Sequence, residues 1–160
     1  MTALVGRERY LAQLDDYFDN GRNFHPNEPS HHVPYLYALL GEREKAQHWV
    51  HRIAAENYAD DPAAGLTGNE DCGQMSAWYI FTALGFYPVH PASAEYVPVC
   101  PLVDRAELRV GENRVFRREK RGNGQHVQEI LLNGQPLARP AIHYREIMAG
   151  GELVFVMDEA

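Results

Sequence analysis

Cysteine is scarce in this 160-residue chain, and its scarcity excludes two kinds of scaffold. Cys72 and Cys100 are the only cysteines, which is too few for a disulfide framework or for a zinc site built from several thiolates. We expect two free thiols, and a Cys72–Cys100 bridge is the alternative.

Long apolar runs and excess positive charge are also missing. The longest mostly apolar stretch, residues 77–89, is interrupted by Thr82 and Gly85 and is too short to span a bilayer. Residues 1–6 are too short for a signal peptide because charged residues follow them. The net charge of −7 argues against nucleic acid or an anionic membrane as the main partner, and it fits a neutral ligand such as a sugar, or a cation.

The composition is that of a folded domain. Hydrophobic residues make up 45% and charged residues 23% of the chain, and this length suffices for one domain or two small units that share an interface. In the first half, apolar residues recur at three- and four-residue spacing. The spacing predicts four helices, at residues 6–19, 30–40, 42–58 and 74–84.

The second half changes to the alternating pattern of strands. Strands are expected at residues 106–110, 115–118, 127–132 and 153–157, and Asn133-Gly134 is typical of a type I′ hairpin turn. The charge run at residues 117–121 is interpreted as a solvated strand end or turn. We therefore expect a mixed α-then-β fold, with about four helices in residues 1–88 and a small antiparallel β unit in residues 89–160.

Two short acidic loops precede the second and fourth expected helices. One begins Asn27-Glu28 and the other contains Asn69-Glu70-Asp71. Short connections make successive helices antiparallel neighbours, so the second and fourth helices point the same way and their loops share one end. We expect these side chains to converge on one pocket suited to carbohydrate chemistry.

The second loop has two interpretations. Asp71 and Gln74 form a D-x-x-Q capping box, which would start the fourth helix without any catalytic role. Alternatively, Asp71 or Glu70 is a general base that activates water, since hydrolysis of a glycosidic bond uses two carboxyl groups. Because the capping box would use Asp71 and not Glu70, Glu70 is freer to bind a sugar hydroxyl.

The first loop and the aromatic residues also have alternatives. Glu28 can accept hydrogen bonds from sugar hydroxyls and, with nearby oxygens, suits a hard cation such as calcium; the alternative is a capping turn with two surface histidines. His31-His32 is not expected to bind zinc, because no H-E-x-x-H pattern is present. The aromatic residues after the second loop form either a sugar-stacking platform or, as we favour, core: Trp78, Tyr79, Phe81, Phe86 and Tyr87.

The chain resembles glycoside hydrolase family 92, the calcium-dependent exo-acting α-mannosidases. The similarity lies in the stretches NEPSHHVPYLYALLG, GLTGNEDCGQMSAWYIFTALGFYPVHPASAEYVPVCPLVDRAEL, ILLNGQPL and HYREIMAGGELVFVMDE, and the G-N-E-D-C-G-Q-M-S-A-W run is its most specific part. The resemblance implies a partial (α/α) helical barrel followed by the β unit. It also implies inverting hydrolysis of α-mannosides in mannose-containing glycans, with Ca²⁺ near the sugar hydroxyls.

The resemblance assigns roles to the loop residues. Asp71 matches the family's general-base aspartate, and Glu28 matches a glutamate that lines the sugar site. Asn69 stands where some members carry an acidic residue that assists the base, and Asn27 stands where some α-1,2-specific members carry histidine. The auxiliary role and the linkage preference therefore stay open, and calcium ligands cannot be assigned.

The family's general acid is a glutamate well upstream of the first loop, and no matching motif is present. The acidic residues before the loop, Glu8, Asp15, Asp16 and Asp19, fall on a helix. We therefore expect the C-terminal portion of a mannosidase that is inactive without its missing N-terminal part. The alternatives are a non-catalytic carbohydrate- or calcium-binding module and an interaction domain that forms homo-oligomers through an exposed helical flank.

Overall fold

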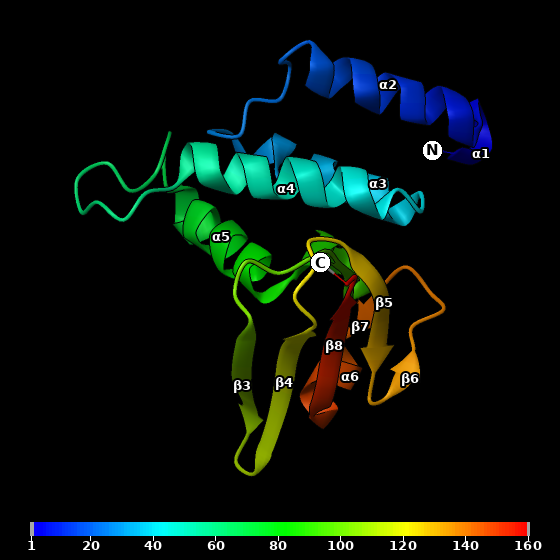
Figure 1. Cartoon of the computed structure of the whole chain (residues 1–160). Helices are drawn as coiled ribbons and strands as arrows, with labels where there is room; N and C mark the ends of the chain where they lie inside the picture. The colour runs from blue at the N-terminus through cyan, green and yellow to red at the C-terminus, as the bar shows by residue number, and fades with distance from the viewer. Residues whose placement is uncertain (1, 160) are drawn as a thin grey trace. The chain divides into compact units, whose positions relative to one another are not determined.

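The computed structural model describes residues 2–159, and its contacts divide the chain between Tyr79 and Ile80 into two compact units. Helices dominate the first unit and strands the second (Figure 1). Within residues 2–159, no helix has the length and apolar character needed to cross a membrane.

Three of the four expected helices are confirmed. The first unit contains α1 (Thr2–Val5), α2 (Arg7–Asp19), α3 (Leu36–Leu39), α4 (Arg43–Asn57) and the first part of α5 (Gln74–Leu84). Residues at helical spacing on α2 and α4 turn inward, among them Leu14 and Phe18 on α2 and Val50 and Ile53 on α4. The apolar periodicity of the sequence thus corresponds to the buried faces.

The expected helix at residues 30–40 is wrong over its first half. The chain instead forms two 3-10 helices, η1 (Glu28–Ser30) and η2 (Val33–Tyr35), before the single turn of α3. Pro29 and Pro34 lie within these turns. Proline has no N–H to donate and its ring clashes with the preceding helical turn, so the segment stays in short, tight turns.

Aromatic side chains fill the core of the first unit. Tyr35, Tyr37 and Trp78 are fully buried. The Tyr58 ring stacks on Trp78 with centroids 5.6 Å apart, and the interpretation of Trp78 as core is confirmed. Tyr79 is 40% exposed, so the core interpretation is wrong for this residue: the buried face of α5 carries Met75 and Trp78, one turn apart.

The second unit contains two sheets. The smaller has the order β1-β2-β7, from β1 (Phe86–His90), β2 (Glu95–Pro98) and β7 (Ile142–His143). The larger has the order β3-β4-β8-β5-β6, from β3 (Arg105–Gly111), β4 (Arg114–Arg121), β8 (Gly151–Met157), β5 (Val127–Leu132) and β6 (Gln135–Pro136). The 3-10 helix η4 (Pro91–Ser93) joins β1 to β2, and α6 (Tyr144–Ala149) precedes β8.

The four expected strands and the expected hairpin turn are confirmed. Asn133 and Gly134 both have positive φ, 51° and 75°, as a type I′ turn requires, and Leu132 pairs with Gln135 across it. The pairs are antiparallel with one exception, since β4 and β8 run parallel. The sequence-based prediction missed β1, β2, β7 and α6.

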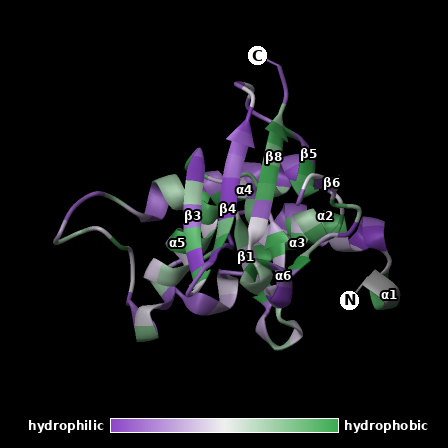
Figure 2. Cartoon of the chain, turned by 90° about the horizontal axis from the view of Figure 1, so that it is seen from below, coloured by the Kyte–Doolittle hydropathy of each residue, from purple (hydrophilic) through white to green (hydrophobic). Residues whose placement is uncertain are grey.

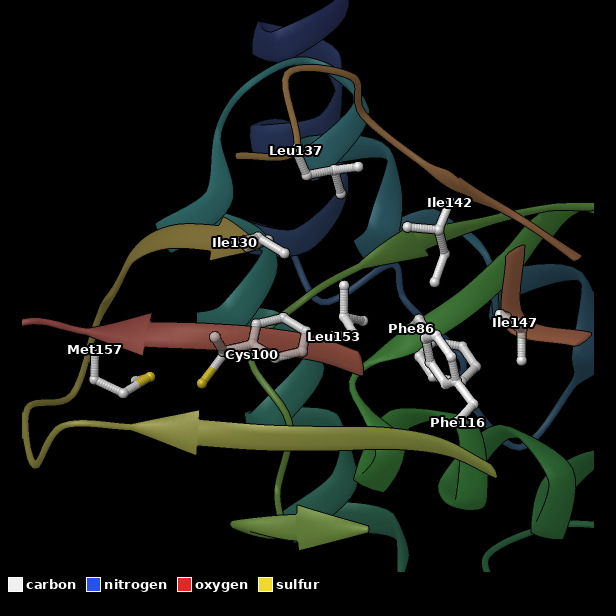
Figure 3. Close-up of a cluster of buried hydrophobic side chains, with 10 residues drawn as sticks. Phe86, Cys100, Phe116, Ile130, Leu137, Ile142, Ile147, Leu153 and Met157 are labelled. Carbon is white, nitrogen blue, oxygen red and sulfur yellow. The ribbon is translucent and has the colours of Figure 1, made fainter. Parts of the chain in front are cut away.

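Buried apolar side chains from both sheets form the core of the second unit (Figure 3). Phe86 from β1, Phe116 from β4 and Leu153 from β8 are each almost fully buried. Figure 2 shows β8 as mostly hydrophobic and β4 as mostly hydrophilic. Phe86 and Tyr87 are buried, as the core interpretation expected. Cys72 and Cys100 are free thiols, also as expected.

One member of the charge run at residues 117–121 is not solvated. Arg118 is fully buried, and its guanidinium donates to the carbonyl oxygens of Val103 at 2.6 Å and Ala83 at 3.3 Å. Ala83 lies in the last turn of α5, where carbonyl groups have no helical partner. The buried guanidinium therefore supplies the end of this helix with a donor.

Candidate functional site

The two acidic loops contact each other directly at Gly68. Gly68 has a φ of +77°, and a Cβ at this position would lie 2.5 Å from the carbonyl oxygen of Pro26. Only glycine permits such a close backbone approach together with a left-handed conformation. Gly68 immediately precedes Asn69, and Pro26 immediately precedes Asn27.

A second set of contacts joins the far ends of the same loops. The indole Nε1 of Trp78 donates to the carbonyl oxygen of His31 at 2.9 Å. The side-chain nitrogen of Gln74 lies 3.4 Å from Nδ1 of His31. The segments 27–30 and 69–73 are therefore held together on both sides, by Pro26–Gly68 before them and by His31–Gln74 after them.

Two buried histidines, His25 and His31, form a hydrogen-bonded cluster next to this junction. The Tyr58 hydroxyl donates to the carbonyl oxygen of Met75 at 2.9 Å, so the bond of 2.9 Å between it and His25 takes its proton from Nε2 of His25. Nε2 of His31 in turn donates to the carbonyl oxygen of His25 at 3.1 Å, and the two imidazole rings stack 4.5 Å apart. Nδ1 of His25 is buried and has no hydrogen-bond partner within residues 2–159.

Burial keeps these histidines uncharged. Desolvation lowers the pKa of His25 from 6.5 to about 3, with a smaller contribution from His31. Desolvation also lowers the pKa of His31, partly opposed by its bond to the His25 carbonyl. The alternative of two surface histidines is therefore wrong for His31, which is fully buried; His32 is half-buried, and desolvation lowers its pKa as well. Sequence reasoning missed His25, because no local pattern marks which histidine is buried.

Glu28 has an unsatisfied carboxylate oxygen. The residue is half-buried in η1, and its Oε1 is buried with no hydrogen-bond partner within the described residues. A buried carboxylate oxygen without a partner costs free energy, so this position is suited to accept a hydrogen bond from a ligand. Beside it, the backbone of Asn27 is fixed, since its carbonyl oxygen accepts from Ser30 Oγ at 2.8 Å, while the residue itself is exposed.

The capping box that one interpretation gave to Asp71 and Gln74 is wrong, because the Glu70 side chain instead bonds to the first turn of α5. The Glu70 carboxylate accepts from the backbone N–H of Ser76 at 3.1 Å and from its hydroxyl at 2.9 Å. The Asp71 carboxylate is exposed, and no group within residues 2–159 bonds to it. Of the two acidic residues, Asp71 is therefore the one free to meet a ligand or water, whereas the capping alternative had left Glu70 free.

The backbone of the second loop turns sharply between Asp71 and α5. Cys72 and Gly73 both have positive φ, 56° and 79°. A left-handed cysteine is uncommon, and such conformations concentrate at functional sites. Asn69, at the other end of the turn, is exposed.

Two acidic residues of α2, Asp15 and Asp16, are engaged in ion pairs. Both oxygens of Asp15 lie 2.8 Å from Nζ of Lys45, and this bond lowers the pKa of Asp15 against a smaller opposing effect of burial. Asp16 is ion-paired with Arg22. A general acid needs a raised pKa to hold its proton near neutral pH. The pKa of Asp15 is lowered instead, so Asp15 is not suited to this role.

Residues 2–159 do not form a complete metal site by themselves. Within residues 2–159, no three or more His, Cys, Asp or Glu side chains gather where they could hold an ion. Calcium takes six to eight oxygen ligands, of which Glu28 would supply one group. The residues present therefore do not fit a calcium cage by themselves.

A hollow of the first unit lies elsewhere. It has a volume of about 550 Å³ and is lined by α2, α4 and the chain between Gly21 and Pro26. None of the five residues predicted as catalytic or sugar-binding lines it. This hollow is therefore built from other side chains than the loop junction.

Comparison with solved structures finds close relatives. The α-mannosidase BT3965 of Bacteroides thetaiotaomicron, a family GH92 enzyme, is 36% identical and has a TM-score of 0.86, over 96% of this chain and 22% of that chain. The same enzyme in complex with mannoimidazole is also similar, with 33% identity and a TM-score of 0.86 over 97% of this chain and 23% of that chain. The family GH92 inverting mannosidase BT2199 of the same organism is 34% identical with a TM-score of 0.77, over 92% of this chain and 20% of that chain.

The comparisons by sequence agree. A secreted glycosidase of Arthroderma benhamiae, otherwise uncharacterized, is 25% identical over 156 residues, which are 94% of this chain and 20% of that protein. The chain thus spans about a fifth of the length of these relatives. The profile of the glycosyl hydrolase family 92 catalytic domain matches residues 1–159, and the chain therefore belongs to glycosyl hydrolase family 92.

Proposed function

We propose that this chain carries the water-activating side of an inverting α-mannosidase site. The observation that carries the proposal is the double contact between the acidic loops, which brackets Glu28 on one loop and Asp71 on the other. Membership of family 92 and the mannosidase activity named for its solved relatives support the substrate class.

Asp71 is the proposed general base. Its exposed carboxylate has no competing partner within residues 2–159, so it can accept a hydrogen bond from a water molecule. In an inverting reaction the base takes a proton from water while the water oxygen bonds to the anomeric carbon. The bond to the leaving oxygen breaks on the opposite face, and a general acid protonates that oxygen.

Glu28 is proposed to hold the sugar. Its buried, unpartnered Oε1 would accept a hydrogen bond from a mannose hydroxyl, and the amide of Asn27 would bind beside it. Glu70 is proposed to act indirectly, since both its oxygens hold Ser76 at the start of α5. Asn69 is proposed to contact the sugar or the water next to the base.

The general acid is proposed to lie outside the residues described. Asp15 and Asp16 are engaged in ion pairs, and loss of a general acid removes a contribution of about 10²–10⁴-fold in rate. We therefore propose that these 160 residues hydrolyse mannosides poorly without the remainder of a family 92 catalytic domain.

Calcium is proposed as a ligand of the larger assembly. Because the carboxylates within residues 2–159 do not form a metal cluster, further oxygen ligands would have to come from elsewhere.

Association of copies through an exposed helical flank stays a prediction.

The experiment is a titration of the 160-residue chain with mannoimidazole, followed by NMR, beside an assay with an aryl α-mannoside. We expect saturable binding to the native chain and binding about tenfold or more weaker in Glu28→Gln, the loss expected for a hydrogen bond to a charged group. Asp71→Asn should alter the shifts around the second loop, and turnover should be absent in every variant. Equal binding by the native chain and Glu28→Gln, or robust turnover by the native chain, would overturn the proposal.

A further inference from the structure

The hollow of the first unit is a second candidate binding site. Its volume of about 550 Å³ lies within the range of small-molecule sites, about 300–1,000 Å³. Residues of α2 and α4 line it together with His25 and Pro26, which come directly before the loop that carries Glu28. It is therefore close in sequence to the proposed mannose site, but built from different side chains.

The polar groups of the hollow have hydrogen-bonding capacity left. Asp19 is exposed and its carboxylate has no hydrogen-bond partner within residues 2–159. Glu56 Oε1 accepts from Nε of Arg52 at 2.7 Å. Oε2 of Glu56 and the terminal guanidinium nitrogens of Arg52 are therefore available to a ligand. Asn23 accepts from the Tyr17 hydroxyl at 3.5 Å, and its side-chain N–H groups stay open.

These groups exclude several kinds of ligand. Two carboxylates in the lining disfavour an anion, and the absence of a three-ligand cluster within residues 2–159 argues against a metal ion. A flat aromatic ligand would need a free ring face. The Trp49 ring stacks on Phe18 at 4.6 Å and has the guanidinium of Arg52 over it at 5.2 Å.

A neutral ligand with many hydroxyl groups suits the lining. Each hydroxyl can donate to a carboxylate oxygen and accept from Arg52 or Asn23, while the half-buried Trp49 side chain provides apolar contact for C–H groups. We propose that this hollow is a second carbohydrate-binding site, for one or two sugar units of a neutral glycan, separate from the site formed by the acidic loops.

The two tryptophans of the chain allow the two sites to be told apart. Trp49 lines the hollow, and Trp78 is bonded to His31 in the loop that carries Glu28. The chain has two tryptophans, so a ¹H–¹⁵N spectrum contains two indole signals, which Trp49→Phe assigns. The probes are methyl α-mannoside and an α-linked mannobiose.

We expect the Trp49 indole signal to shift saturably with the probe. In Asp19→Asn the affinity measured from this signal should fall about tenfold or more, while the Trp78 signal responds as in the native chain. Asp60→Asn, at an exposed carboxylate outside the hollow, is the matched control and should leave both curves unchanged. Because Asp19 is exposed, the replacement should not unfold the chain, and an unchanged Trp78 signal verifies this.

Two results would overturn the inference. One is a Trp49 signal that does not respond to either sugar, and the other is a response that Asp19→Asn leaves intact. Neither result bears on the mannose site, because Glu28→Gln tests that site through the Trp78 signal. Loss of the Trp78 response in Glu28→Gln together with a silent Trp49 would leave the proposed function standing and remove the second site alone.

Discussion

At the scale of single residues, Gly68 decides whether the acidic loops can meet. The space for a side chain at this position is occupied by Pro26, whose carbonyl oxygen and Cβ would lie 2.5 and 2.6 Å from an added Cβ. Both are on a rigid proline, so neither can move aside as a flexible side chain would. The contact between the loops thus requires a residue without a Cβ at position 68.

Gly68→Ala should therefore destabilise the first unit and separate the loops. We expect a loss of more than about 2 kcal/mol, because the left-handed φ alone costs about 1–2 kcal/mol for a residue with a Cβ and the clash adds to it. The measurement is urea unfolding followed by tryptophan fluorescence, since Trp49 and Trp78 both lie in the first unit.

Gly41→Ala is the matched control for this change. Gly41 has a similar φ of +84°, with nothing within 4 Å of an added Cβ, so it should lose only the conformational share of about 1–2 kcal/mol. Equal losses in the two variants would mean that the approach of Pro26 to Gly68 contributes nothing to stability.

The residue types of the site could be read from the sequence, but their surroundings could not. Carboxylates and amides cluster before apolar runs at Glu28 and at residues 69–71, which predicts a site there, and the structure holds the two loops against each other. The sequence did not show that Glu70, and not Asp71, bonds to the start of α5. The reason is the positive φ of 56° at Cys72, which breaks the regular spacing that a capping box assumes.

At the scale of elements, the start of α5 depends on Glu70. Its carboxylate holds both the N–H and the hydroxyl of Ser76 and places negative charge near the positive end of the helix. Asp71, one residue later, makes no such bond. Neighbouring carboxylates in one turn should thus contribute differently to stability.

Glu70→Gln should lower the free energy of unfolding of the first unit by about 1 kcal/mol, the usual value of a helix cap. Asp71→Asn, which removes the same charge from the same turn, should change it by less than about 0.5 kcal/mol, as for a surface side chain without partners. Thermal unfolding of the two variants side by side is the measurement. A larger loss in Asp71→Asn than in Glu70→Gln would show that Asp71 is the cap after all.

Helices and strands with a strong apolar periodicity could be predicted from the sequence. Strands that form only through pairing with residues distant in sequence could not. The helices α2, α4 and α5 follow from apolar spacing, and the hairpin at Asn133-Gly134 follows from local turn chemistry. The strands β1 and β2 carry prolines at positions 88 and 98, which read as a connector, and β7 is too short to show alternation. The parallel pairing of β4 with β8 joins residues far apart in sequence, which local patterns do not contain.

At the scale of the whole molecule, the pKa shifts of the buried histidines and of the ion-paired carboxyl groups act in one direction. Burial lowers the pKa of His25, His31 and His32. Ion pairing lowers the pKa of carboxyl groups in both units, among them Asp15 through Lys45 and Glu146 through Arg139. In both cases the unfolded chain binds more protons than the folded chain, so acid favours unfolding.

The two sets of groups act in different pH windows. A histidine with a lowered folded pKa contributes full stability above its unfolded pKa of 6.5, and for His25 this stability is lost between that pH and about 3. A carboxyl group with a lowered pKa contributes stability above its unfolded value, 3.8 for Asp15 and 4.5 for Glu146, which is lost only in stronger acid. Between pH 7.5 and 5 the histidines therefore dominate.

We expect His25 alone to remove about 2 kcal/mol from the stability of the first unit between pH 7.5 and 5, from about 1.4 kcal/mol per pH unit below 6.5. His25→Gln keeps a donor for Tyr58 but cannot gain a proton, so urea unfolding at the two pH values should show a difference smaller by that amount. His48→Gln, at an exposed histidine of α4, should keep the native difference. If His25→Gln keeps it as well, His25 takes up its proton without unfolding, and the buried pair with His31 is not what makes this chain sensitive to acid.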